Sequence, residues 1–135
     1  MGRKLKYLSF ILILSSSTTL LAQDDSVYRQ VDVPAEPLKG TLGWDRYIKE
    51  NLKYPQKARE LNIQGEVEVQ FIVNIDGTVD RPLILKGIGG SCDREAIRLV
   101  KNSPKWKSAL IRDKSKNNNL RKVRSLVTIP IEFKL

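Results

Sequence analysis

The sequence predicts an α+β fold in which two or three helices pack on a three-stranded antiparallel sheet. Two segments alternate between apolar and polar residues, and a third apolar segment follows a tight-turn signal that comes after the first of them. Prolines occur in two of these three segments, and proline favours sheet edges because it cannot donate a ladder hydrogen bond. Placing the proline-free strand in the middle gives the strand order second, first, last.

The first 22 residues have the pattern of an export signal. Three basic residues before position 7 precede a short apolar run from Leu8 to Leu14. Five consecutive Ser and Thr residues then interrupt the apolar run at 15–19, whereas a spanning helix needs about 20 mostly apolar residues. We therefore predict a signal peptide over residues 1–22, cleaved after Ala22, with an uncleaved inner-membrane anchor as the alternative.

Residues 23–43 are polar and contain two prolines and two glycines, which predicts a flexible lead-in. The folded domain is expected to span residues 44–135. Its first helix is predicted over residues 44–52, where Trp44, Tyr47 and Ile48 are spaced for one face. Pro55 suits the first turn of a short second helix, because its missing N–H has no partner there in any case. A third helix ends before Pro104 and carries one apolar face, formed by Cys92, Ala96, Leu99 and Val100.

The first and clearest strand runs from Glu66 to Ile75, with apolar residues at nearly every second position. Asp76-Gly77 then signals a hairpin, because both central positions of the tightest hairpin turn need positive φ. The returning strand covers residues 78–86 and contains Pro82, and the last strand covers residues 127–135 and contains Pro130. Between them, residues 108–122 are polar and basic and predict an exposed loop. The predicted core is Val67, Val69, Phe71, Val73, Leu99, Val100, Ile129, Ile131 and Phe133.

The residue inventory argues against catalysis. The chain has no His and a single Cys, Cys92, which excludes His-dependent nucleophiles and an internal disulfide. Cys92 is interpreted as a core residue rather than a reactive thiol, and Trp106 as a core plug rather than an exposed anchor. Glu66 and Glu68 share the polar face of the first strand, which favours solvent exposure over a catalytic carboxylate pair. No enzymatic activity, cofactor or metal site is expected.

The net charge is +9, and the basic excess lies late in the chain. Between Arg98 and Lys134 there are eleven Lys or Arg residues and two acidic ones. This pattern is compatible with a solvated surface, or with binding to an anionic membrane, an acidic polymer or an acidic peptide. Nucleic acid is disfavoured as a partner, because the leader directs export and the basic residues are not interleaved with aromatic ones.

Six short blocks occur in a fixed order in the second half of the chain, and this ordered set is more specific than any one of them. They are Tyr54-Pro55, Gly65–Val73, Asp76-Gly77, Asp93–Ile97, Pro104–Trp106 and Ile129–Phe133. Together they resemble the C-terminal domain of the TonB family of energy transducers. The resemblance implies a small α+β domain that binds a receptor peptide along its last strand and performs no chemistry.

The resemblance also implies where the peptide binds and which proteins supply it. The expected partner is an outer-membrane receptor or another envelope protein of a Gram-negative cell, met in the periplasm. A full transducer has a membrane helix with a functional His and a Pro-rich spacer, so this sequence favours a stand-alone module. The alternative is a structural envelope protein that binds cell-wall polymer or anionic lipid through residues 112–124. The candidate peptide-binding residues are Asn51, Leu52, Lys53, Leu126, Val127, Thr128, Ile129, Ile131 and Glu132.

Overall fold

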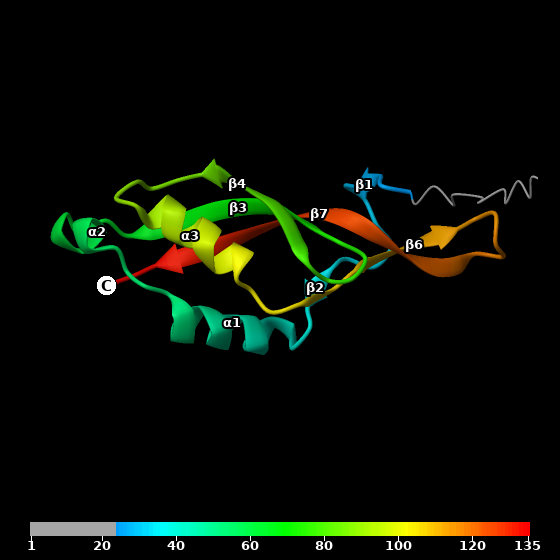
Figure 1. Ribbon diagram of the computed structural model, residues 1–135, viewed down its shortest axis with the longest axis horizontal. Coiled ribbons are helices and arrows are strands. Elements are labelled where there is room, and N and C mark those ends of the chain that lie inside the picture. The colour runs from blue at the N-terminus through cyan, green and yellow to red at the C-terminus, as the bar shows by residue number, and fades with distance from the viewer. Residues whose placement is uncertain (1–23) are drawn as a thin grey trace, which may run out of the picture.

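The computed structural model describes residues 24–135, so the predicted signal peptide lies outside the described residues. Figure 1 shows an elongated α+β molecule in which α3 lies against one face of the sheet and α1 lies beside it. The helices are α1 (Gly40–Asn51), α2 (Gln56–Glu60) and α3 (Cys92–Lys101). The strands are β1 (Val27–Tyr28), β2 (Glu36–Pro37), β3 (Gly65–Val73), β4 (Val79–Lys86), β5 (Trp106–Lys107), β6 (Ala109–Asp113) and β7 (Asn119–Phe133).

The main sheet confirms the α+β class but corrects the predicted number of strands. Its order is β1-β7-β3-β4, with β6 also paired to β7, and β2 and β5 form a separate two-stranded sheet. The predicted order second, first, last is present at its centre as β4-β3-β7. The prediction of three antiparallel strands is wrong, because β7 is 15 residues long and extends well beyond β3. Its first half pairs instead with β6 and, in parallel, with β1.

Two turns differ from the sequence prediction. Asn74 and Thr78 close the predicted β3–β4 hairpin, but only Gly77 has positive φ, at 84°. The turn is therefore a type I turn followed by a left-handed glycine. The predicted loop at 108–122 is wrong, since β6 and β7 form a second hairpin. At its tip both Asn117 and Asn118 have positive φ, the geometry of a tight hairpin turn.

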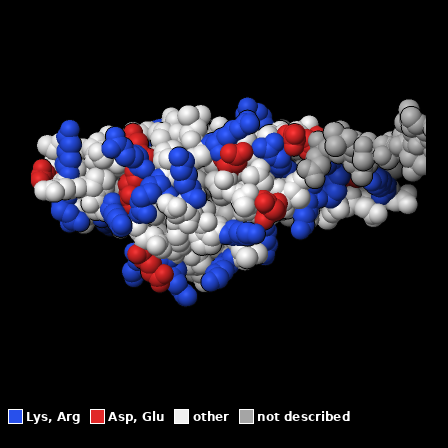
Figure 2. All heavy atoms as spheres, viewed as in Figure 1, with Lys and Arg blue, Asp and Glu red and all other residues white. Residues whose placement is uncertain are grey.

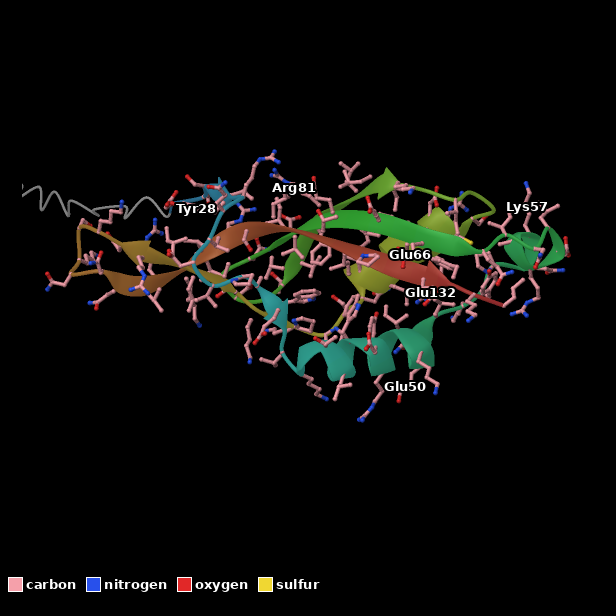
Figure 3. All side chains as sticks on the ribbon, turned by 180° about the vertical axis from the view of Figure 1, so that it is seen from behind. Tyr28, Glu50, Lys57, Glu66, Arg81 and Glu132 are labelled. Carbon is pink, nitrogen blue, oxygen red and sulfur yellow. The ribbon has the colours of Figure 1, made fainter. Side chains whose placement is uncertain are left out.

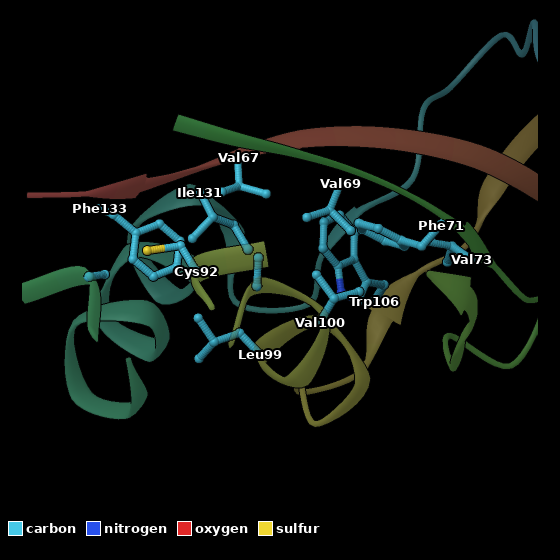
Figure 4. Packing of buried hydrophobic residues seen from close by; sticks show 12 residues of the cluster. Val67, Val69, Phe71, Val73, Cys92, Leu99, Val100, Trp106, Ile131 and Phe133 are labelled. Carbon is cyan, nitrogen blue, oxygen red and sulfur yellow. The ribbon is translucent and has the colours of Figure 1, made fainter. Parts of the chain in front are cut away.

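The core lies between the sheet and α3, as Figure 4 shows. Every predicted core residue except Ile129 is buried, and Ile129 is partly buried against the same cluster. Trp106 is 5% exposed and packs edge-on against Phe71 and Trp44, with ring centroids 5.2 and 5.4 Å apart. Cys92 is fully buried. Both residues are therefore core residues, as predicted.

Residues 24–43, expected to form a flexible lead-in, make specific pairings. β1 pairs with β7, β2 pairs with β5, and α1 begins at Gly40, ahead of its predicted start. Arg124 of β7 donates one hydrogen bond to the backbone oxygen of Asp25 and another to the side chain of Asn74, both at 2.9 Å. These contacts place β1 against Arg124 and Ser125 near the middle of β7, next to the part of that strand described below.

Candidate functional site

One edge of the sheet is open along the second half of β7. On that side, β1 pairs with residues 124–125. No strand within residues 24–135 covers the same edge from Leu126 to Phe133. An edge of this kind presents unpaired backbone groups to another chain.

The opposite edge, on β4, is irregular. Arg81 has a φ of 49°, Pro82 follows it, and the pairing with β3 shifts register twice. Bulges and prolines are the usual means by which proteins protect an edge from further pairing. The β7 edge is regular, since nine consecutive residues pair with β3 without a shift. It is therefore the better template for an added strand.

Pro130 determines which backbone groups of β7 point outward. It lies opposite Glu68 in an unbroken antiparallel ladder, and it has no N–H to donate. It must therefore occupy a position whose backbone groups face away from β3, and neighbouring residues alternate with it. Leu126, Thr128 and Glu132 then direct N–H and C=O outward. The predicted site residues Val127, Ile129 and Ile131 have their backbone groups bonded to β3.

A groove separates this edge from α1. Its volume is about 520 Å³, and its apolar wall comes from Trp44 and Ile48 of α1 together with Leu52. No residue of α1 is fully buried, so the apolar face of this helix remains partly open along the groove. The other wall is formed by residues 130–132 of β7. Charged residues at the rim are Asp45, Lys49, Glu66, Glu132 and Lys134.

The segment that links α1 to α2 is fastened to α3. The Glu95 carboxylate accepts a hydrogen bond from the backbone N–H of Lys53 at 2.8 Å, and Arg98 donates to the backbone oxygen of Asn51 at 2.8 Å. Arg98 also forms an ion pair with Glu95 at 2.6 Å. Burial raises the pKa of Glu95, but the hydrogen bonds from Arg98 and Lys53 outweigh it and hold that pKa below its ordinary value. Leu52 is thereby held at the end of the groove.

The structure brings part of the predicted site together. Leu52, Ile131 and Glu132 line the groove, and Leu126 and Thr128 lie on the same strand edge. Asn51 and Lys53 use the backbone groups named above to bind α3, and their side chains are exposed. Trp44, Ile48 and Glu66 also line the groove and are not among the predicted site residues. The helical spacing of Trp44, Ile48 and Leu52 predicts that they share one helix face. It does not predict that this face lies opposite a strand edge.

We define the arm as residues 109–123. The basic stretch at 112–124 lies on the arm, except for Arg124, which lies at its base. Three of its arginines have acidic partners: Arg112 lies 3.9 Å from Asp32, Arg121 lies 3.4 Å from Asp24, and Arg124 lies 3.5 Å from Asp80. The exposed lysines of the arm are Lys114, Lys116 and Lys122.

Positive charge is not confined to the arm. In Figure 2, Lys and Arg occur along the whole length of the visible face, with Asp and Glu among them. The arm is therefore one of several places on this face where basic side chains meet solvent.

Within residues 24–135, no helix combines the length and apolar character needed to cross a membrane. The model of the family described as Gram-negative bacterial TonB protein C-terminal matches residues 50–135, well over half of the chain. No curated protein and no solved structure matches the chain. The matched region contains β3, β4, β7 and α3, and thus the open strand edge and the residues that fasten the neighbouring segment.

Proposed function

The chain belongs to the TonB C-terminal family of the Gram-negative envelope, and we propose that it captures an extended peptide by strand addition. The observation that carries this proposal is the regular edge of β7 from Leu126 to Phe133, which no strand within residues 24–135 covers. Residues 130–132 of this edge line a groove with an apolar wall. Main-chain hydrogen bonds supply affinity in this binding mode, and pockets for alternate side chains supply specificity.

The proposed partner is a segment of an outer-membrane receptor or of another envelope protein, met in the periplasm. The role is binding, without chemistry on the peptide. Leu126, Thr128 and Glu132 offer backbone groups to the peptide, and Pro130 offers only its carbonyl. Peptide side chains that point toward α1 meet Ile48 and Leu52. Because one donor is missing at Pro130, the pairing is interrupted or bulged at that position.

The alternative partner, a cell-wall polymer or anionic lipid, would use the arm. Its support is weaker, since Arg112, Arg121 and Arg124 already have acidic neighbours. Binding through Lys114, Lys116 and Lys122 would fall steeply as salt rises, because exposed charges are screened within about 10 Å at 0.1 M salt. Strand pairing depends much less on salt.

The test is a proline at position 128. Pro130 already occupies a position of the same orientation, so Thr128→Pro removes an outward N–H and leaves the ladder to β3 in place. We expect a peptide from the periplasmic end of an outer-membrane receptor to bind the variant roughly 3- to 10-fold more weakly, the effect of one lost hydrogen bond. Fluorescence anisotropy measures the affinity, and amide NMR spectra verify the fold.

Thr128→Val is the matched control, because it changes the side chain but keeps the N–H. It should bind as the unmodified chain does. Unchanged binding by the proline variant would contradict capture at this edge and would direct attention to the arm.

A further inference from the structure

Two carboxylates face each other across β3 and β7. Glu66 pairs directly with Glu132, and both side chains are exposed. Figure 3 views the sheet from the side opposite α3, and both residues lie on that side. Glu132 has the same orientation as Pro130, so this is a pair without mutual backbone hydrogen bonds, in which the Cα atoms approach to about 4.5 Å.

No cation within residues 24–135 compensates this pair at close range. Neither Glu66 nor Glu132 has an ion-pair partner within 4.0 Å among the described residues. Lys49 and Lys134 lie on the rim of the same groove, outside that distance. Like charges directly opposite each other destabilise a sheet. A third side chain of positive charge would therefore relieve the repulsion between Glu66 and Glu132.

A strand added at the open edge places a third side chain in this row. Neighbouring strands lie about 4.8 Å apart, and directly opposite residues have Cβ atoms about 4.5–5.5 Å apart. The peptide residue opposite Glu132 therefore has its side chain beside two carboxylates. The residues before and after it point to the other face, toward the apolar wall formed by Trp44, Ile48 and Leu52.

We propose that the captured peptide carries Lys or Arg opposite Glu132, with an apolar residue on each side of it. This inference rests on the proposed strand addition and names the chemistry of its partner. It makes Glu132 and Glu66 specificity-determining residues, while the backbone edge determines that a peptide binds at all. An acidic residue at the same position would meet two like charges.

The test uses three capped, fluorescently labelled nonapeptides in which Val alternates with Thr and the central residue is Lys, Gln or Glu. We expect the unmodified chain to bind the Lys peptide most tightly, then the Gln peptide, then the Glu peptide. The affinities of the Lys and Glu peptides should differ roughly tenfold at low salt. The ratio of the two affinities should fall as added salt screens the charges. Glu132→Lys should reverse the order.

Glu50→Lys is the control, because it makes the same charge change at an exposed residue of α1 that does not line the groove. It should keep the original order of affinities. Equal affinities for the three peptides, or an order that survives Glu132→Lys, would overturn the charge preference and leave strand capture standing. If none of the three binds, strand capture and the charge preference both fail.

Discussion

The carboxylate of Glu95, on α3, accepts a hydrogen bond from the backbone N–H of Lys53, 42 residues earlier in the chain. Glu95 is 8% exposed, and its oxygens also accept hydrogen bonds from Arg98 at 2.8 and 2.6 Å. Arg98 in turn binds the backbone oxygen of Asn51. These contacts form a clasp, defined as Asn51, Lys53, Glu95 and Arg98, that fixes one end of the groove.

Glu95→Gln should weaken the clasp. The amide keeps the shape of the side chain but removes the negative charge that Arg98 faces. Its NH2 group also cannot accept a hydrogen bond, although both carboxylate oxygens of Glu95 do. We expect the free energy of unfolding in urea to fall by roughly 1.5–3 kcal/mol, the usual value for hydrogen bonds to a charged group. Glu50→Gln, at an exposed position of α1, should stay within about 0.5 kcal/mol of the unmodified chain. An equally small effect at Glu95 would contradict the clasp.

The clasp also predicts a loss of stability in acid. The pKa of Glu95 is lower in the folded chain than its ordinary value of 4.5, so its stabilisation is fully present above that value. It is lost as the pH falls through the lower, folded pKa. The pKa values of Asp24, Asp76 and Asp113 are also lowered, that of Asp24 to about 2, and they act in the same direction. Urea melts across this range should show a smaller acid loss in Glu95→Gln than in the unmodified chain.

Gly77 should tolerate no side chain. Its φ is 84°, its carbonyl accepts the N–H of Trp106 at 2.9 Å, and an added Cβ would lie 2.1 Å from the Trp106 carbonyl oxygen. Gly89 provides a matched control, since its φ is 77° but an added Cβ meets nothing within 4 Å. Gly89→Ala should cost only the backbone strain, about 1–2 kcal/mol. Gly77→Ala should lower the free energy of unfolding clearly more in the same urea melts. Equal losses in the two variants would contradict a clash with the Trp106 carbonyl.

The sequence predicted the centre of the sheet because its physical signals there are local. Apolar alternation marked β3 and β7, and two prolines marked β4 and β7 as edges relative to β3. Pro82 does lie in the β4 edge strand. The hairpin of the arm was not predicted, because Lys and Asn residues between Asp113 and Leu120 suggested a loop. The available signal was Asn117-Asn118, since Asn accepts the positive φ that a tight hairpin turn needs.

The site was harder to predict than the fold, since it depends on distant segments meeting. Alternation alone indicates that Glu66 and Glu132 lie on polar strand faces. Only the register of β3 against β7 makes them direct neighbours. Likewise, the apolar spacing of Trp44 and Ile48 predicts a packed helix face, and it does not reveal that part of that face borders a groove. Glu95 lies in the first turn of α3, and its burial follows from the path of residues 51–53.

The facing carboxylates of Glu66 and Glu132 predict a substitution that stabilises the fold. Glu132→Gln removes the repulsion at a close, exposed pair, and the free energy of unfolding in urea should rise by about 0.2–1 kcal/mol. Glu66→Gln should give a similar gain, and the double variant should gain little more, because the repulsion is already gone after the first change.

Glu68→Gln should change the free energy of unfolding in the opposite direction. Glu68 lies on the same sheet face but pairs with Lys86 on β4 and with Pro130 on β7, so its charge has a favourable cross-strand neighbour. Its loss should lower the free energy of unfolding by a few tenths of a kcal/mol. A destabilised Glu132→Gln would show that this carboxylate already has a compensating partner. Stabilisation would mean that the folded chain keeps an unfavourable pair at the open edge, a strain that a basic peptide residue would relieve on binding.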